Sequence, residues 1–397
     1  MGALISFSLA TLAIFLAIPV AALLIEVVAA VILPPRQSSA QERGDQRVAV
    51  LIPAHNESTG LLPTIANIKE QLHETDDLLV IADNCTDDTA VVAAAAGADV
   101  ITRTDLDKKG KGYALAAGLL HLVNNPPDVV IIIDADCRLA DTAINQLTAA
   151  CASTNRPVQL RYLMIAPAES PISFRVAEFA WRLKNWVRPL GLMTLGLPCQ
   201  LMGSGMAFPW NVVRLADLAN GSIVEDLKLG LDLALTGYPP VFCPFSGITS
   251  EFPFTVEGAQ SQRMRWEQGH IRTILATTPR LIRAAIARAN LDLLALALDL
   301  SIPPLSLLGI LVVGALALSS LATLFGGSSA AMAISIANLA GFVCAVFISW
   351  LKFGRDVLPA SAFPLVARYV IAKLPIYRQL LLRGGSSHWI RTDRWKP

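Results

Sequence analysis

The sequence predicts an α/β domain with a mostly parallel sheet, joined to transmembrane and interfacial α-helices. Three observations lead to this fold class. Between residues 47 and 260, short apolar runs alternate with helical patterns, which is typical of a parallel sheet with helices on both faces. Outside this range lie apolar runs long enough to span a bilayer, which takes roughly 20 residues. Only 16% of the 397 residues are charged, compared with about 25% in soluble domains.

The overall charge argues against nucleic acid as a partner. The formal net charge is +1, and no basic stripe with interleaved aromatic residues is present. The six cysteines lack the spacing of a zinc site, and we interpret them as free thiols. The mean hydropathy of +0.53 instead favours a membrane protein with lipids as partners.

The N-terminal segment, residues 1–35, is predicted to be a transmembrane helix. Its apolar run carries a single charge, Glu26. A cleaved signal peptide is the alternative, but it would need Lys or Arg before a shorter apolar run, and none precedes this one. We therefore expect a retained anchor, followed by a polar linker over residues 36–46.

The globular domain is predicted over residues 47–260. Its strands are expected at residues 48–52, 78–82 and 129–133, separated by helices near residues 61–71, 89–96 and 113–123. Ligands of such sheets bind at the carboxyl ends of the strands. Polar residues follow those ends in three places: Asn56-Glu57, Asp83-Asn84 and Asp134-Ala135-Asp136. The sequence therefore places a site at this edge of the sheet.

Three segments follow the globular domain. They are an interfacial amphipathic helix at residues 261–290, a transmembrane hairpin at residues 291–352, and an interfacial helix with a cytosolic tail at residues 353–397. Pro303 and Pro304 predict a kink or boundary in the first arm of the hairpin, and residues 325–329 form its turn.

Basic residues flank the globular side of all three predicted spans. They are Arg36, Arg43, Arg288, Lys352 and Arg355. By the positive-inside rule, the globular domain and the C-terminus are cytoplasmic and the N-terminus is outside. We expect an integral protein of a bacterial inner (plasma) membrane.

Two carboxylates, Asp134 and Asp136, follow the third predicted strand with one residue between them. At a strand end, such a pair can reach a divalent cation and, through it, a diphosphate. Carboxylate oxygens favour a hard ion, so we expect Mg²⁺ or Mn²⁺ as the cofactor. The alternative is a solvated turn, which the motif alone does not exclude.

A second acidic pair, Glu225 and Asp226, precedes a helical pattern. A carboxylate is the expected group to take a proton from an acceptor hydroxyl as it attacks the anomeric carbon of a sugar. The alternative is that both acids only stabilise the first turn of a helix.

The third motif combines Gln262, Arg265 and Trp266. A guanidinium group can clamp diphosphate oxygens, and an indole can form the floor of a sugar pocket. The alternative is that arginine and tryptophan anchor an interfacial helix among lipid headgroups.

Together these motifs resemble family 2 glycosyltransferases of the GT-A fold, in particular the membrane-integrated branch. That branch includes cellulose, hyaluronan and chitin synthases, ceramide glucosyltransferases and exopolysaccharide enzymes. The similarity runs from residue 48 to residue 266, and the arrangement of the predicted spans extends it to the C-terminal hairpin. The longest matching motif is the Gln-x-x-Arg-Trp sequence that ends at Trp266.

The resemblance implies a role for each matching residue. For the nucleotide-sugar donor, it implies contacts from Pro53, His55, Glu57, Asp83, Lys111, Asp134, Gln262, Arg265 and Trp266. For the acceptor, it implies contacts from Gly203, Ser204, Gly205 and Trp266. It assigns the metal to Asp136 and Asp134, and catalysis to Asp226 as the base with Glu225 beside it.

The chain departs from the family pattern after the second predicted strand. The usual pair of aspartates is Ala82-Asp83 here, so the expected contact with the nucleotide base depends on Asp83 alone. Asn84 and Cys85 stand where glycine and serine are typical, which leaves the local turn open.

The implied reaction is a direct displacement that inverts the anomeric centre, because one base and no second nucleophile match the pattern. We expect a hexosyltransferase that moves a sugar from a nucleotide-sugar such as a UDP-hexose to a lipid-linked acceptor, for glycolipid or exopolysaccharide synthesis. A processive polysaccharide synthase is the alternative, although known processive relatives carry more spans than the three predicted here.

A membrane transporter and a non-catalytic sugar-binding protein are further alternatives. Three spans do not easily enclose a transport path, and Asp292 and Asp299 lie near a helix end, where charged side chains reach the interface at low cost. Loss of the motif acids would support a non-catalytic protein, but all of them are present.

Overall fold

The computed structural model describes residues 2–33, 43–219, 224–374 and 377. These residues form two compact units. The helical unit contains residues 2–33, 169–197, 267–374 and 377, and the sheet unit contains residues 43–168, 198–219 and 224–266. Residues 169–197 therefore group with the helical unit, although the range 47–260 predicted for the catalytic domain includes them.

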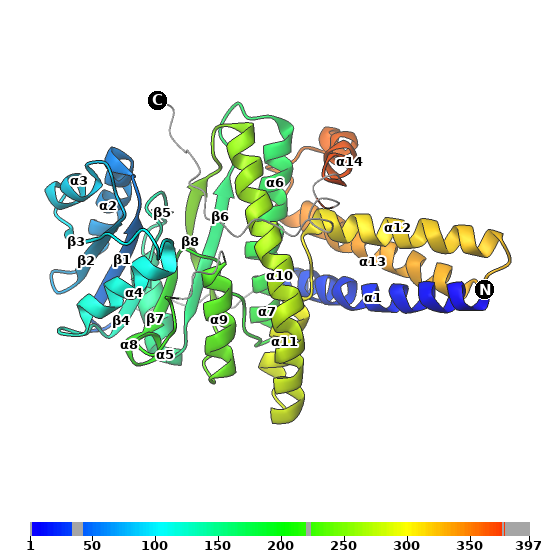
Figure 1. The fold of residues 1–397 in the computed structure, drawn as a ribbon, viewed down its shortest axis with the longest axis horizontal. Helices are drawn as coiled ribbons and strands as arrows, with labels where there is room; N and C mark the ends of the chain where they lie inside the picture. Colours follow the sequence, from blue (N-terminus) through cyan, green and yellow to red (C-terminus); the bar gives the residue numbers. More distant parts are fainter. Residues whose placement is uncertain (1, 34–42, 220–223, 375–376, 378–397) are drawn as a thin grey trace. The chain divides into compact units, whose positions relative to one another are not determined.

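A sheet of eight strands forms the centre of the sheet unit in the part of the chain described, with the order β3-β2-β1-β4-β7-β6-β8-β5 (Figure 1). The strands are β1 Val48–Ala54, β2 Asp77–Asp83, β3 Asp99–Arg103, β4 Val129–Ile132, β5 Arg138–Leu139, β6 Val158–Ile165, β7 Met206–Pro209 and β8 Val241–Glu251. Strands β3, β2, β1 and β4 are parallel, whereas β7 is antiparallel to both neighbours. The three strands predicted from apolar runs are confirmed as β1, β2 and β4.

Helices pack against this sheet. They are α2 Leu62–Lys69, α3 Thr89–Ala95, α4 Lys111–Leu122, α5 Ala143–Thr154, α8 Trp210–Val213 and α9 Glu225–Leu235, with a 3-10 turn at Ser58–Leu61. Helices α4 and α9 begin near the acidic residues that follow β4. Buried leucines of α4 and α9, such as Leu115 and Leu229, share one apolar cluster with Leu51 of β1 and Ile81 of β2. Burial of these side chains, worth roughly 1.5–3 kcal/mol each, holds both helices against the sheet.

Three helices of the helical unit are long and apolar enough to cross a membrane. They are α1 Gly2–Ile32, α12 Leu305–Leu324 and α13 Ala330–Phe353. All three contact one another and lie side by side in Figure 1. The predicted first arm of the hairpin, residues 291–324, is two helices, because α11 Leu291–Leu300 ends before the Pro303-Pro304 pair. Proline lacks the amide hydrogen that a continuous helix needs, which explains the break.

The rest of the helical unit consists of shorter or amphipathic segments. They are α6 Ile172–Arg182, a π-helical turn at Leu183–Val187, α7 Arg188–Thr194, a 3-10 turn at Ala360–Ala362 and α14 Phe363–Ala372. Helix α10, Val256–Arg288, is uninterrupted and contributes residues to both units. The interfacial helix predicted to begin at residue 261 is thus the continuation of a helix that starts five residues earlier.

The single charged side chain of α1 is buried in an ion cluster. Arg188 donates from Nε to Glu26 Oε2 at 2.9 Å, and from Nη2 to the backbone oxygen of Asp299 at 2.6 Å. The same Nη2 also donates to the Asp299 carboxylate. The interpretation of Asp299 as a residue that reaches the membrane interface is therefore wrong, because its buried carboxylate is paired with Arg188 inside the unit.

Candidate active site

The acidic pair after β4 lies at the carboxyl end of the parallel half of the sheet. Asp134 and Asp136 are half-buried, and Ser250 of β8 donates from Oγ to Asp136 Oδ2 at 2.5 Å. Ligand atoms of Asp134, Asp136 and Cys137 lie within 4.8 Å of one another. This grouping could hold one metal ion.

The donor set of this grouping favours a hard cation. Burial, with the charge of Asp134 as a second cause, raises the pKa of the Cys137 thiol to about 12. Ser204 donates from Oγ to the Cys137 sulfur at 3.2 Å, so the thiol is held as a neutral structural group. The two carboxylates remain as ligands, and oxygen ligands suit Mg²⁺ or Mn²⁺.

Lys111 connects this acidic pair to a neighbouring loop. It is the first residue of α4, and its ammonium group contacts the Asp134 carboxylate and donates to the Gly203 backbone oxygen at 2.5 Å. Burial alone would lower the pKa of Lys111, but the charges of Asp134, Glu225 and Asp226 raise it above its usual value. Lys111 is therefore a permanent cation among the predicted site acids.

The loop of Gly203, Ser204 and Gly205 is fixed by a buried side chain that the sequence did not indicate. Gln159 of β6 accepts from the Met202 amide at 2.7 Å and donates to the Ser204 oxygen at 2.9 Å. Gly203 has a φ of +99°, and a Cβ atom there would lie 3.3 Å from Asp226 Oδ2. Glycine thus permits both the backbone conformation and the close approach to the predicted base.

Glu225 and Asp226 form the first turn of α9, as the alternative interpretation of this pair required. Their position beside Lys111 and Gly203 nevertheless places them in the same cluster as the acidic pair after β4. Burial and the charge of Asp226 raise the pKa of Glu225 to about 8, and the charge of Lys111 opposes this shift. At neutral pH Glu225 is therefore largely protonated.

This shift predicts a pH-dependent stability. The Glu225 carboxyl keeps its proton in the folded protein up to about pH 8, whereas in the unfolded chain it loses the proton near pH 4.5. Since the folded state binds more protons between these values, stability should fall as pH rises from about 4.5 to 8 and level off above. Each kcal/mol lost should lower the melting temperature by about 2–4 °C.

Thermal unfolding in detergent between pH 5 and pH 9 measures this effect in the wild type and in Glu225→Gln. The glutamine variant has no carboxyl group to titrate at this position. As the pH rises, the melting temperature of the wild type should therefore fall relative to that of the variant. Parallel curves for the two proteins would show that the pKa of Glu225 is ordinary.

The third motif lies on α10. The Gln262 side chain is 1% exposed, and neither polar atom of its amide has a hydrogen-bond partner among the described residues. A buried amide without partners costs about 1–3 kcal/mol, which suggests that it serves a purpose other than stability. Burial lowers the pKa of Arg265, and the charge of Glu225 opposes this shift, so Arg265 is close to the acidic cluster. Trp266 is half-buried on the same helix.

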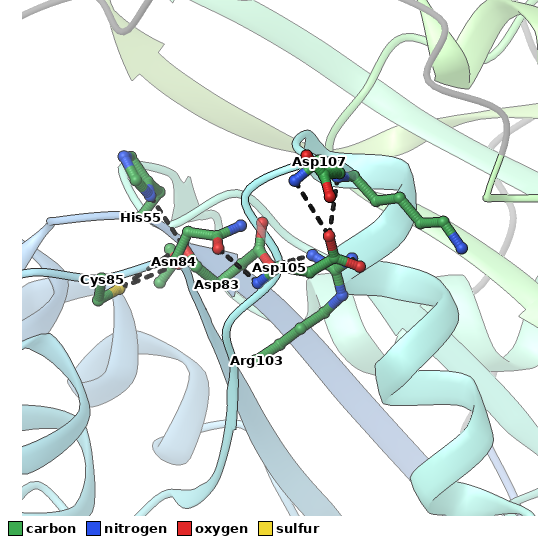
Figure 2. A network of polar contacts seen from close by, with 9 residues as sticks. His55, Asp83, Asn84, Cys85, Arg103, Asp105 and Asp107 are labelled. Atoms are coloured by element: carbon green, nitrogen blue, oxygen red, sulfur yellow. Dashed lines mark hydrogen bonds and ion pairs between the residues drawn. The ribbon is translucent and has the colours of Figure 1, made fainter.

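A second group of predicted residues gathers where β1 and β2 end (Figure 2). His55 Nδ1 is 2.7 Å from the backbone oxygen of Asp83. Glu57 donates its amide to Thr89 Oγ1 at 2.9 Å. The Asp83 carboxylate accepts from Arg103 Nη1 at 2.6 Å. Asp83 and Arg103 are register partners on the parallel strands β2 and β3, which explains the ion pair.

Asparagine replaces the family's usual glycine in the turn after β2 without loss of the turn. Asn84 has a φ of +52°, a left-handed conformation that asparagine tolerates better than most residues. Its Oδ1 accepts from the Asp105 amide at 2.8 Å, which ties the turn to the loop after β3. The local turn left open by the sequence is therefore formed.

The predicted residues thus occupy two groups at one edge of the sheet. Lys111, Asp134, Asp136, Gly203, Ser204, Glu225 and Asp226 form the first, with Arg265 nearby. Pro53, on β1, lies close to the second group, of His55, Glu57 and Asp83. Three supporting residues were not predicted, although each holds a predicted residue in place: Arg103, Gln159 and Ser250. Gln159 had no distinguishing sequence signal, since Arg161 interrupts the same apolar run.

Comparison with known proteins identifies relatives of this arrangement. The probable glycosyltransferase YdaM of Bacillus subtilis is 23% identical over 258 residues, which cover 62% of this chain and 60% of that protein. The chain thus spans less than two thirds of the length of YdaM. An uncharacterized glycosyltransferase of Mycobacterium bovis is 30% identical over 190 residues, which cover 42% of this chain and 83% of that protein.

A solved structure has the same fold. The mannosyltransferase PcManGT from Pyrobaculum calidifontis, in complex with GDP-Man and Mn²⁺, superimposes with a TM-score of 0.53 at 17% identity, covering 95% of this chain and 100% of that chain. The GT-A fold implied by the sequence resemblance is confirmed. A family model described as "Glycosyltransferase like family 2" matches residues 45–269, more than half of the 397 residues. The chain therefore belongs to glycosyltransferase-like family 2.

Proposed function

We propose that this chain is an inverting glycosyltransferase that moves a hexose from a UDP-hexose donor to a lipid-linked acceptor at a membrane. The observation that carries the proposal is the convergence of the acids after β4, the first turn of α9 and the loop at Gly203 around Lys111. Donor-side and acceptor-side groups of the family pattern are thereby brought within reach of one another.

The residues divide the reaction between them. Asp226 accepts the proton of the acceptor hydroxyl as that oxygen attacks the anomeric carbon, and the bond to the nucleotide diphosphate breaks. The cations Lys111 and Arg265 stabilise the negative charge that collects on the leaving diphosphate. One base and a direct attack invert the anomeric centre. The loop of Gly203, Ser204 and Gly205, with Trp266, binds the acceptor.

A divalent cation fits the acidic pair. Asp134 and Asp136 supply oxygen ligands at a strand end, and the nearby Cys137 is a neutral thiol, so the donor set suits Mg²⁺ or Mn²⁺. The bound ion would neutralise charge on the diphosphate of the donor. PcManGT was solved in complex with Mn²⁺, which is consistent with this assignment.

The donor nucleotide is assigned to the edge where β1 and β2 end. The pairing of Asp83 with Arg103 holds the Asp83 carboxylate in one orientation, next to His55. A fixed carboxylate can accept hydrogen bonds from the base without a further loss of side-chain entropy. The buried amide of Gln262 and the half-buried Arg265 complete the donor contacts that the family pattern implies.

The apolar helices support an integral membrane protein. We propose that α1, α12 and α13 cross a bacterial inner membrane, with the sheet unit and the C-terminus in the cytoplasm. The Ser328 amide donates to Ser6 Oγ at 3.1 Å, so the start of α1 and the turn between α12 and α13 lie together. This contact supports a common location of both outside the cytoplasm.

Cysteine labelling tests this topology. A Ser328→Cys variant, in a background without other cysteines, should react with a membrane-impermeant maleimide on intact spheroplasts. A cysteine at Asp141, an exposed residue of the sheet unit, is the control and should react only after the membrane is broken. The opposite pattern would reverse the proposed orientation.

A transfer assay tests the function itself. Membranes that contain the protein should move radiolabel from a UDP-hexose into extractable lipid, in the presence of Mg²⁺ or Mn²⁺ and not with chelator. The donor panel includes GDP-mannose, because PcManGT was solved with it. A ladder of long products would indicate a processive synthase, label in water-soluble products would contradict the lipid acceptor, and transfer from no donor would contradict the function.

A further inference from the structure

Glu267 directly follows Trp266 on α10, and a hydrogen-bonded network in the helical unit holds its carboxylate. Lys373 contacts Oε1 through its ammonium group, and Tyr377 donates from its hydroxyl to Oε2 at 2.9 Å. Ser306 Oγ lies 2.6 Å from the Tyr377 hydroxyl oxygen. Both carboxylate oxygens of Glu267 are therefore engaged from outside α10.

The direction of each hydrogen bond in the network follows from its chemistry. An ionised carboxylate only accepts, so Tyr377 gives its single hydroxyl proton to Glu267. The Tyr377 oxygen is then an acceptor for the Ser306 hydroxyl. The chain runs from Ser306 through Tyr377 to Glu267, and its last acceptor is charged, which makes the bond stronger than one between neutral groups.

The network joins three parts of the helical unit. Ser306 lies in the first turn of α12, one of the three candidate spans, and Lys373 and Tyr377 follow α14. The side chains of Lys373 and Glu267 are only 13% and 17% exposed, and Tyr377 is buried. An ion pair shielded in this way is screened less by salt than a surface pair, whose contribution is about 0–1 kcal/mol.

We infer that Glu267 is a positioning residue, through which Lys373, Tyr377 and Ser306 set the rotation of α10 and thereby the orientation of Gln262, Arg265 and Trp266. Helix α10 is uninterrupted, so Glu267 is joined to these residues through one hydrogen-bonded ladder. Side chains lie about 5–6 Å from a helix axis, so a rotation of about 20° would move them by about 2 Å. Displacements of about 1 Å in positioning groups can cost about 100-fold in rate.

The inference rests on the proposed function for its activity readout, because the motif at Gln262, Arg265 and Trp266 must act on the substrates. The second readout, amide hydrogen exchange, does not depend on the proposed function. If the network anchors α10, its loss should increase amide hydrogen exchange over residues 262–266, whether or not the protein transfers sugar. The two readouts separate a failure of this inference from a failure of the proposed function.

Three single variants each remove one interaction of the network: Glu267→Gln, Lys373→Met and Tyr377→Phe. Each should lower kcat by about 10-fold or more, because the side chains of Gln262, Arg265 and Trp266 would no longer be held in one orientation. Exchange over residues 262–266 should rise in each. The double variant Glu267→Gln/Tyr377→Phe should lose no more than the worse single variant, since both changes break the same link. Lys373→Arg keeps the charge and should retain activity.

Asp356→Asn is the matched control, because it removes an ion pair with Arg182 in the same unit, in which Glu267 takes no part. Its kcat and its exchange over residues 262–266 should equal those of the wild type. Tyr377→Phe is the mildest change and covers the case in which Glu267→Gln fails to fold. Unchanged exchange in Tyr377→Phe, or a kcat within twofold of the wild type, would overturn the inference. So would a loss of kcat that Asp356→Asn shares, since the effect would then be general destabilisation.

Discussion

Asp226→Asn should slow sugar transfer by at least about 100-fold and leave the affinity for the donor nucleotide close to that of the wild type. A general base contributes about 10²–10⁴-fold in rate. An acid that only stabilises the first turn of a helix contributes about 0.3–1 kcal/mol to stability. Asp226 lies at the start of α9, and its Oδ2 faces the loop at Gly203 where the acceptor is proposed to bind.

The two measurements for this variant are initial transfer rates and calorimetric titration with UDP. Asp232→Asn is the matched control on the same helix, since Asp232 pairs with Lys228 on a partly exposed face. It should transfer sugar at the wild-type rate. Glu225→Gln should be milder than Asp226→Asn, because Glu225 is largely protonated at neutral pH. A near wild-type rate in Asp226→Asn would return the pair to the role of helix-start acids.

Asp136→Asn should abolish transfer and metal-dependent nucleotide binding together. The change removes a negative oxygen ligand from the proposed cation site, and a hard divalent ion depends strongly on ligand charge. Ser250, which donates to Asp136 Oδ2, can still donate to an amide oxygen, so the local hydrogen bond is compatible with asparagine. The folded, membrane-inserted protein should therefore persist.

Titration with UDP in the presence and absence of Mn²⁺ separates the metal from the scaffold. The wild type should show a strong dependence on Mn²⁺, and Asp136→Asn should show almost none. Asp141→Asn, an exposed residue five positions further on, is the control and should behave as the wild type. Transfer by the wild type in excess chelator would reject the metal, and retained Mn²⁺ dependence in Asp136→Asn would reject Asp136 as its ligand.

The strands found from sequence share a physical property that the missed strands β3 and β8 lack. The strands β1, β2 and β4 are buried almost throughout, so they read as continuous apolar runs. The edge strand β3 is half-exposed and begins with Asp99, and β8 contains Pro244 and Gly247, which break the pattern. The antiparallel position of β7 between β4 and β6 depends on pairings between distant segments, which apolar runs do not encode.

The acidic residues of the site were predicted from the sequence, but the residues that hold them in place were not. Asp134, Asp136, Glu225 and Asp226 could be found because each stands at the end of a strand or the start of a helix, where a fold of this class places its ligands. Their partners were not found. Ser250 is 114 residues from Asp136 along the chain, and Arg103 is 20 residues from Asp83. Nothing in the local pattern distinguishes these two residues from other polar residues of the chain.

By itself, the sequence determined the α/β class, the three apolar helices and the edge of the sheet where charged residues gather. Those features depend on the order of apolar and polar residues over a few turns of chain, which is a local property. The tertiary structure alone decided which charges pair: Asp83 with Arg103, Glu26 and Asp299 with Arg188, and Glu267 with Lys373. It also decided that Tyr377 donates a hydrogen bond to Glu267. The physical reason is that electrostatic and hydrogen-bond energies depend on distances in space, and Glu267 and Tyr377 are separated by 110 residues of chain.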